Sequence, residues 1–539
     1  MKPDQPEQPG RPNQGGNGGR DKPPRDIDRE PVPPPRQYIA PVEGRVLDPA
    51  TAIVVKGVHP RSTVYVGPRL TISKSVDVGE KVDILKDMAA ELGWRADVED
   101  EDDATRDLPH GVIKIKLSVA SRRTTLAPDG WTLLQQSRGK RGTRFLRGVG
   151  LDHVIMPSIP LHDANPLHDA NPLHDANPLH DANPHRTGRS SAIAMYAELG
   201  HGGRQPIAYA GPRPYRRDAK DLPGRRPVVA LLDTGCAPHT WLDTVVDTKV
   251  ALDGRPIGHT DPDTAPDLRG DLVGPLDGTL DVLSGHGTFI AGLVHQACPD
   301  ADILAWRVVP SQGPIVESDL VTALSQIAEL VRRDAEGKKG GRRIDVLSLS
   351  MGYYHETPED HLFDHTLYEI LEDLGRHGVM VVCSAGNDAT SRPSFPAAFA
   401  PWSDGLGPIP IRTDVVPVVS VGAQNPSRRT DALFSNAGPW VNLYVPGAAV
   451  MSTMPGLEGG YQPMARTVAF GRVRSTIDPD DFRGGFGVWS GTSFAAPLVA
   501  GWMAADLVES LESRGAHVEV EDRVRRAWDV VERCTPIRS

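Results

Sequence analysis

Residues 228–235 read Val-Val-Ala-Leu-Leu-Asp-Thr-Gly, an uninterrupted apolar run that stops at an aspartate and a glycine. Such a run, with no polar alternation, is typical of a strand covered on both faces in a parallel sheet. Further runs at 303–309, 345–349, 379–383 and 415–421 alternate with apolar stripes of helical spacing at 320–331 and 362–374. This alternation predicts an α/β fold with a doubly wound, mostly parallel sheet over residues 226–510.

The aspartate that closes the first run, Asp233, is a candidate functional residue. Ligands of open α/β sheets bind beyond the carboxyl ends of the strands, where this carboxylate is expected to lie. Taken alone, it could equally be an aspartate that ends a strand in a turn. Asp-Thr-Gly is also a motif of aspartic peptidases, which pair two such aspartates. The chain has a single Asp-Thr-Gly, so that class is excluded.

Two further motifs supply a base and a nucleophile. Residues 284–288 read Ser-Gly-His-Gly-Thr, and the two glycines leave room around His286 for backbone and substrate. Residues 489–497 read Trp-Ser-Gly-Thr-Ser-Phe-Ala-Ala-Pro, which predicts a turn that places Ser493 at the start of a helix. A serine hydroxyl is inert without a nearby base and a group that orients the base. His286 and Asp233 are candidates for these two roles.

A fourth motif, residues 384–387, reads Ser-Ala-Gly-Asn and follows the run at 379–383. There the Asn387 amide could donate to the oxyanion of a tetrahedral intermediate, beside the Ser493 backbone N–H. Asparagine is also frequent in ordinary turns. The assignment therefore depends on the other three motifs.

In this order, the four motifs resemble those of the subtilisin-like serine peptidases, the subtilases, over residues 226–510. The resemblance implies a serine endopeptidase that hydrolyses polypeptides through an acyl-enzyme intermediate and needs no cofactor. It implies that Asp233 orients the imidazole of His286, which acts as base and then as acid. It also implies that Ser493 attacks and that Asn387 and the Ser493 N–H stabilise the oxyanion.

The resemblance further implies how a substrate binds, with its extended main chain paired to a strand edge as in β-augmentation. The residues that would pair with it and wall the primary specificity pocket are Ser350, Met351, Gly352, Ser384, Ala385 and Gly386. Cys383 lies beside them, but within an apolar run it is expected to be a buried structural thiol and not a nucleophile.

The chain departs from the family pattern in its loops. The connection from the His286 segment to the run at 303 is short, so the loop that binds the family's strong calcium is expected to be missing, and no metal site is predicted. Insertions at 260–279 and 456–487 are expected to be polar surface loops that flank the cleft. A second interpretation stays open: a catalytically silent subtilase fold that binds extended segments of a partner.

The N-terminal part of the chain divides into two regions. Residues 1–50 are rich in proline and glycine and are expected to be disordered. Residues 51–158 predict a small α/β module with strands at 63–72 and 112–120 and a helix at 82–92. The module loosely resembles the inhibitory propeptides of subtilases; a targeting or partner-binding domain is the alternative.

Residues 159–225 are expected to be a linker, with four tandem copies of Leu-His-Asp-Ala-Asn-Pro at 161–184. Asn-Pro disfavours helix, and without a scaffold to fix the histidines an extended linker is favoured over a metal site. If the module is a propeptide, self-processing is expected between residues 159 and 225. Residues 511–539 are expected to form a helical segment, with a polar helix at 518–534 packed on the catalytic core.

Composition excludes several classes. A net charge of −11 and the lack of a dense Lys/Arg stripe argue against a nucleic-acid binder. The sequence contains no apolar run of about 18 residues, so no membrane span is predicted. The first residues also lack the apolar core of a secretory signal. The dispersed cysteines show no metal-type pairing, which favours free thiols and a cytoplasmic protein, with leaderless export as the alternative. They are Cys236, Cys298, Cys383 and Cys534.

Overall fold

The computed structural model describes residues 30–100, 105–120, 126–157, 193–197, 199–200, 202–273, 276, 278–310, 313–357, 366–512 and 516–539. Two clusters of buried apolar side chains organise these residues. The smaller cluster lies between Leu47 and Leu151, and the larger between Ile155 and Ile537. We call described residues 30–157 the N-terminal module and described residues 193–539 the large unit. The Leu-His-Asp-Ala-Asn-Pro repeats lie outside the described residues.

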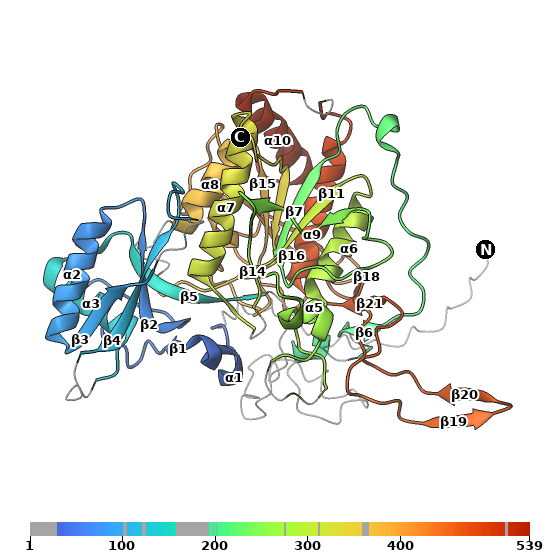
Figure 1. Cartoon of the computed structure of the whole chain (residues 1–539), viewed down its shortest axis with the longest axis horizontal. Coiled ribbons are helices and arrows are strands. Elements are labelled where there is room, and N and C mark those ends of the chain that lie inside the picture. The colour runs from blue at the N-terminus through green and yellow to red at the C-terminus, as the bar shows by residue number, and fades with distance from the viewer. Residues whose placement is uncertain are drawn as a thin grey trace, which may run out of the picture.

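The large unit is built on a seven-stranded sheet in which all neighbouring strands are parallel, in the order β17-β16-β15-β13-β7-β11-β8 (Figure 1). The strands are β7 (Val228–Asp233), β8 (Val246–Asp247), β11 (Asp302–Arg307), β13 (Val346–Leu349), β15 (Met380–Ser384), β16 (Val419–Gln424) and β17 (Leu443–Pro446). The predicted α/β fold with a mostly parallel sheet is confirmed. Every residue of β7 is buried, which explains why its sequence does not alternate.

Helices cover both faces of this sheet (Figure 1). On one face α6 (His286–Ala297) packs against α9 (Thr492–Leu507), and on the other α7 (Glu317–Ala335) packs against α8 (Thr366–Arg376). The apolar stripes of the sequence correspond to α7 and α8. Where a C-terminal polar helix was expected, α10 (Val520–Cys534) packs against α9 and buries Val524, Trp528 and Val531.

Smaller elements complete the large unit. An antiparallel sheet joins β6 (Gln205–Pro206), β18 (Val450–Thr453) and β21 (Phe486–Trp489), and β21 leads directly into the segment before α9. Two hairpins are formed by β9 (Ala251–Leu252) with β10 (Arg255–Pro256) and by β19 (Arg466–Ala469) with β20 (Arg472–Ser475). The four-residue helix α5 is Pro266–Arg269.

The N-terminal module has the order β2-α2-β3-β4-α3-β5, in which two helices pack on an antiparallel sheet. Its elements are α1 (Arg36–Ile39), β1 (Gly44–Leu47), β2 (Thr63–Ser73), α2 (Val78–Glu91), β3 (Trp94–Val98), β4 (Val112–Val119), α3 (Gly130–Arg141) and β5 (Val149–Pro157). Helix α2 begins before the predicted residue 82 because the Asp77 carboxylate accepts the Glu80 N–H and caps it.

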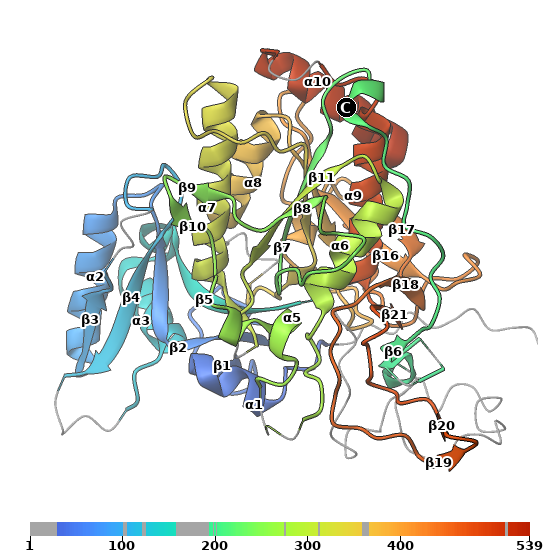
Figure 2. The same cartoon turned by 45° about the vertical axis from the view of Figure 1, so that its right-hand side comes forward.

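Strand β5 connects the module to the large unit, as the long strand between them in Figure 2 shows. Beyond its pairing with β2, it pairs with two short strands of the large unit, β12 (Ile315–Val316) and β14 (Met351–Gly352), both antiparallel. The Asp152 carboxylate of β5 also accepts hydrogen bonds from the N–H and the hydroxyl of Ser318, in the first turn of α7. The module is therefore docked through main-chain and side-chain hydrogen bonds.

Two expectations drawn from local composition are wrong. Within residues 30–50, where disorder was expected, β1 pairs with β2 and Leu47 joins the module's buried cluster. Within the expected linker 159–225, residues 205–206 form β6 and Arg216 and Arg217 pair with Asp302 and Asp300. The partners of both segments are distant in sequence, so local polarity did not reveal them.

Among the described residues, no helix combines the length and the apolar character that crossing a bilayer requires.

Candidate active site

The Asp233 and His286 side chains meet at the carboxyl end of β7. Asp233 is the last residue of that strand, and His286 is the first residue of α6, after Gly285 with a φ of +87°. The Asp233 Oδ1 atom lies 2.7 Å from His286 Nδ1 and also accepts the Thr234 N–H at 2.7 Å. Since the carboxylate can only accept, Nδ1 carries the proton and Nε2 is left as the basic nitrogen.

A second buried carboxylate, Asp267 of α5, ties the same two segments together. Its Oδ1 atom accepts the Thr234 hydroxyl at 2.6 Å and the Gly285 N–H at 3.2 Å, and its Oδ2 atom accepts the Thr288 N–H at 2.9 Å. Burial raises the pKa of Asp267. The expectation that residues 260–279 are only a polar surface loop is therefore wrong at Asp267, which no sequence signal singled out.

Replacement of Asp267 by asparagine is expected to lower the free energy of unfolding by about 1–3 kcal/mol, because an amide NH2 would face the Thr288 donors. The measurement is a urea titration in the Ser493→Ala background, which avoids self-digestion. Asp263→Asn is the matched control, since Asp263 pairs with Arg269 in the same segment but is exposed. Equal stability of the two variants would contradict the role given to Asp267.

Ser493 lies in the first turn of α9, and the next residue, Phe494, contacts the His286 ring. The ring of Phe494 lies 5.3 Å from the imidazole, centroid to centroid. The Ser493 Oγ atom donates to the Ser350 carbonyl at 3.3 Å, and the Ser350 hydroxyl donates to the Ser493 carbonyl at 3.0 Å. Among the described residues, His286 Nε2 has no hydrogen-bond partner. The structure thus joins Asp233 to His286 by a hydrogen bond and places Ser493 at the start of the helix that packs on α6, with no hydrogen bond from the serine to His286 Nε2 among the described residues.

The Asn387 side chain is oriented by the residue before Ser493. Its Oδ1 atom accepts the Thr492 N–H at 2.9 Å and the Thr492 hydroxyl at 3.0 Å. A backbone N–H can only donate, so the atom near it must be the amide oxygen. The amide nitrogen Nδ2 is buried and has no partner among the described residues. A fixed, unused donor held by the residue before Ser493 is suited to an oxyanion.

The residues expected to bind substrate lie around this serine, and part of the group is already paired. The main chain of Met351 and Gly352 pairs with Pro157 and Met156 of β5. On the opposite wall, the Gly386 N–H donates to the Thr492 hydroxyl at 3.1 Å. The strand expected to pair with substrate therefore holds the end of the chain's own module.

That wall continues through three more residues. Ser384 ends β15, and the Ala385 carbonyl accepts Asn436 Nδ2 at 2.9 Å. Cys383 is fully buried, and burial raises the pKa of its thiol. All four cysteines are free thiols.

Residues 31–34 of the N-terminal segment lie over the same place. They share a pocket with Met156 and Pro157 of β5 and with Gly386 and Asn387 of the large unit. Two parts of the module, residues 31–34 and the end of β5, therefore line a pocket together with Gly386 and Asn387 of the candidate site.

Arg204 is a further residue that the sequence did not reveal. Its guanidinium donates to the carbonyls of Leu280 and Asp281 and to that of Ser284, at 2.7–2.9 Å, and lies over the Trp489 ring. Burial lowers its pKa to about 10. These contacts join the segment before His286 to the segment before Ser493. Arg204 therefore fixes the position of the two segments relative to each other.

A buried ion-pair network lies where β5 meets the large unit. His153 places Nδ1 2.6 Å from a Glu317 oxygen and Nε2 2.7 Å from a Glu356 oxygen. Each ring nitrogen faces a carboxylate, so the ring is an imidazolium. Burial alone would lower the pKa of His153, but the two carboxylates outweigh it and raise the pKa to about 10.

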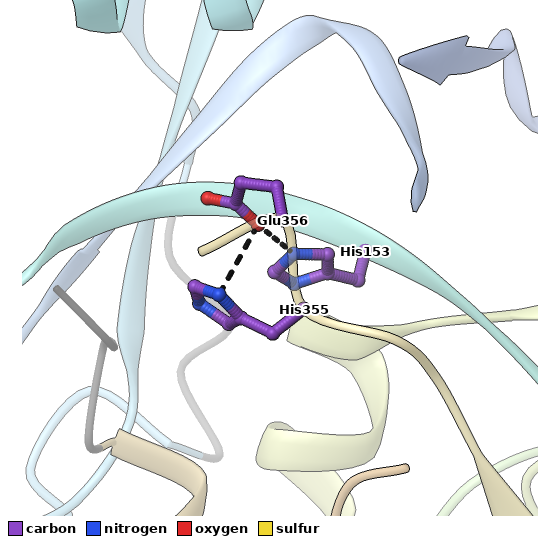
Figure 3. A group of neighbouring side chains, drawn as sticks. All are labelled: His153, His355 and Glu356. Carbon is purple, nitrogen blue, oxygen red and sulfur yellow. Dashed lines mark hydrogen bonds and ion pairs between the residues drawn. The ribbon is translucent and has the colours of Figure 1, made fainter. Parts of the chain in front are cut away.

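Figure 3 shows that His355 approaches the same Glu356 carboxylate. Within the described ranges, His153, His355 and Glu356 form a group whose potential metal-ligand atoms lie within 4.8 Å of one another. Their hydrogen bonds fit an ion pair better than a metal site. Both nitrogens of His153 already face carboxylates, and His355 Nδ1 accepts the Thr357 N–H at 3.0 Å.

The chain is similar to known proteins in sequence and in structure. The model of the Subtilase family matches residues 224–527. The major intracellular serine protease of Bacillus subtilis is 24% identical over 312 residues, covering 54% of this chain and 72% of that protein. The intracellular serine protease of Paenibacillus polymyxa is 26% identical over 296 residues, covering 52% and 66%.

Among solved structures, fervidolysin from Fervidobacterium pennivorans, described as a keratinolytic enzyme related to subtilisin, matches with 18% identity and a TM-score of 0.42. The match covers 86% of this chain and 58% of that one.

Proposed function

Because the chain belongs to the subtilase family, we propose that it is a serine endopeptidase in which Asp233, His286 and Ser493 form the catalytic triad. The observation that carries the proposal is the Asn387 amide. Thr492, the residue before Ser493, holds its oxygen, so its nitrogen is left as a buried donor without a partner among the described residues. Together with the Asp233–His286 hydrogen bond, this gives the site an oriented base and an oxyanion donor.

The reaction follows from these positions. The Ser493 hydroxyl turns from the Ser350 carbonyl to His286 Nε2, gives it the proton and attacks the scissile carbonyl carbon. Asn387 Nδ2 and the Ser493 N–H stabilise the oxyanion. His286 then passes its proton to the leaving amine, and the departure of the amine leaves the acyl-enzyme. A water molecule activated by the same imidazole hydrolyses the acyl-enzyme. Asp233 stabilises the imidazolium throughout.

An active-site-directed fluorophosphonate tests this proposal. We expect it to label the protein once the module has been removed by limited digestion, and to label Ser493→Ala under no condition. Folded protein that remains unlabelled after removal of the module would favour the alternative, a silent subtilase fold that binds extended segments of a partner.

We propose that the N-terminal module is an inhibitory propeptide. The pairing of β5 with Met351 and Gly352 supports this, because it occupies the edge on which a substrate would bind. The capping of α7 by Asp152 supports it too. Self-processing is proposed between residues 159 and 225. Polypeptides are the proposed substrates, and the cytoplasm is the proposed location, since the two relatives above are named as intracellular.

Docking of the module is expected to weaken as the solution becomes alkaline. The docked module raises the pKa of His153 from about 6.5 to about 10. The protonated His153 therefore stabilises the docked state fully below about pH 6.5, and this contribution is lost as the pH rises through 10. The measurement is the rate of module release from Ser493→Ala across this pH range. His153→Gln is expected to cost about 3–5 kcal/mol of docking and to flatten the alkaline part of the profile.

Ionised Glu356 is expected to make docking of the module depend on pH in the acidic range. Burial alone would raise its pKa, but His355 and His153 hold that pKa below the usual range. Its contribution is therefore present above about pH 4.5 and is lost at lower pH. Module release that does not accelerate at high pH would contradict the role given to His153.

A further inference from the structure

A β-hairpin arm projects outward from the large unit, beyond β18 and β21 (Figures 1 and 2). We call residues 461–477 the arm; its strands β19 and β20 form a separate two-stranded sheet. Among the described residues, they pair with no strand other than each other. Their outer edges therefore carry backbone groups available for a third strand.

The arm exposes large apolar side chains. Met464 is 96% exposed, Phe470 at the tip is fully exposed, and Ile477 is 83% exposed. Val468 and Val473, which are cross-strand partners, are 67% and 56% exposed. A two-stranded ribbon cannot bury such side chains by itself, and contiguous exposed apolar surface marks an interaction site.

The arm is also basic, although the whole chain is acidic. It carries Arg466, Arg472 and Arg474 and no aspartate or glutamate, against a net charge of −11 for the chain. Arg472 and Arg474 are two residues apart on β20, so they point to the same face, about 7 Å apart. Val473, between them, points to the opposite face with Val468. Basic and apolar side chains thus alternate along the edge strand.

The base of the arm is fixed to the catalytic segments. β18 and β21 pair on either side of it, and the Thr453 hydroxyl at the end of β18 donates to the Thr288 carbonyl of α6 at 2.8 Å. β21 leads through Ser490 to Ser493. The arm is therefore an insertion between the two strands that connect the segments of His286 and Ser493.

We infer that the arm is a binding site for polypeptide substrates, which add an extended segment of alternating acidic and apolar residues to the free edge of β20. Acidic side chains of the added strand pair with Arg472 and Arg474, and its apolar side chains cover Val473 and Val468. The inference rests on the proposed peptidase function and adds a substrate class to it. It assigns to the insertion at 456–487 a role in holding substrate.

An anionic membrane is the less suitable occupant of this surface. Insertion of the arm into the apolar layer would bring the unpaired backbone groups along the edges of β19 and β20 into hydrocarbon, where they would lack hydrogen-bond partners. An extended polypeptide supplies those partners, and the position of the arm between β18 and β21 also favours a polypeptide.

Binding is tested on the full chain carrying Ser493→Ala, with a labelled peptide of alternating glutamate and valine followed by fluorescence anisotropy. The charge reversal R472E/R474E is expected to weaken binding by about tenfold or more, and added salt to weaken binding to the unreversed arm. R428E/R429E is the matched control: an exposed arginine pair in a turn elsewhere on the large unit, expected to bind the peptide unchanged. A peptide of alternating lysine and valine should not bind.

The same reversal in the active enzyme should raise the KM of a long substrate bearing the acidic-apolar segment about tenfold, and leave hydrolysis of a short peptide unchanged. Peptide binding is measured without catalysis. A protein that hydrolyses no peptide would therefore refute the peptidase proposal, while the binding assay would still decide whether the arm binds the peptide. Peptide binding unaffected by R472E/R474E overturns the inference. So does binding of phosphatidylserine vesicles in place of the peptide, or a dimer by light scattering that the reversal dissociates.

Discussion

Replacement of Ser493 by alanine is expected to lower kcat by about 10⁶, the size of the loss that subtilisin itself shows for its nucleophile. Two neighbouring groups are poor substitutes for it, because Ser350 donates its hydroxyl to the Ser493 carbonyl and burial raises the pKa of the Cys383 thiol. Activity is measured with a fluorogenic peptide, after limited digestion has removed the module and the digesting protease has been inhibited.

The same variant reports on self-processing. Mass spectrometry of freshly purified wild type should show a shortened product with its new N-terminus between residues 159 and 225, and Ser493→Ala should stay full length. The fold should be unaffected, because the hydrogen bond from the serine hydroxyl to the Ser350 carbonyl is long, at 3.3 Å. Residual activity above about 10⁻² of wild type, or a variant that processes itself, would refute the assignment of the nucleophile.

The second large effect is expected at Asn387. Replacement by leucine should lower kcat by about 10²–10³ and leave KM nearly unchanged, a magnitude taken from subtilisin's own oxyanion asparagine. The expected reason is that Asn387 Nδ2 is a buried donor without a partner among the described residues, held by Thr492 next to Ser493 in the chain, and can strengthen its hydrogen bond as charge develops on the substrate oxygen.

Thr492→Val separates catalysis from structure at this position. It removes the hydroxyl that donates to Asn387 Oδ1 and accepts the Gly386 N–H, but leaves Nδ2 and the Thr492 N–H in place. Its effect on kcat should be about tenfold, below that of Asn387→Leu, because only one of the two lost hydrogen bonds orients the amide and each contributes about 1 kcal/mol. If Asn387→Leu raised KM and left kcat intact, Asn387 would be a ground-state binding residue.

The module matters in both experiments because its strand β5 occupies the edge of Met351 and Gly352, where a substrate is expected to bind. Its contacts combine a main-chain ladder with buried charges, and His153 must keep its proton for the charges to balance. A peptide substrate competes for Met351 and Gly352 but brings no such imidazolium. We therefore expect the intact, protonated module to bind this edge more tightly than a peptide substrate does.

Much of this could be predicted from the sequence because the signals are local. A strand buried on both faces shows an unbroken apolar run, and the turns before His286 and Ser493 depend on glycines next to them in the chain. The fold class and the positions of Asp233, His286, Asn387 and Ser493 at strand and helix ends follow from such signals. Subtilase membership follows from their order.

Only the tertiary structure decided the rest, since the contacts involved join residues far apart in the chain. In the sequence, Asp267 is one of several acidic residues in a polar loop. In the structure, its carboxylate accepts hydrogen bonds from Thr234 and Thr288. Arg204 lay in an expected linker, yet it holds the loops before His286 and Ser493. A buried charge is tolerated only where distant donors or acceptors converge on it, and that convergence is a property of the fold.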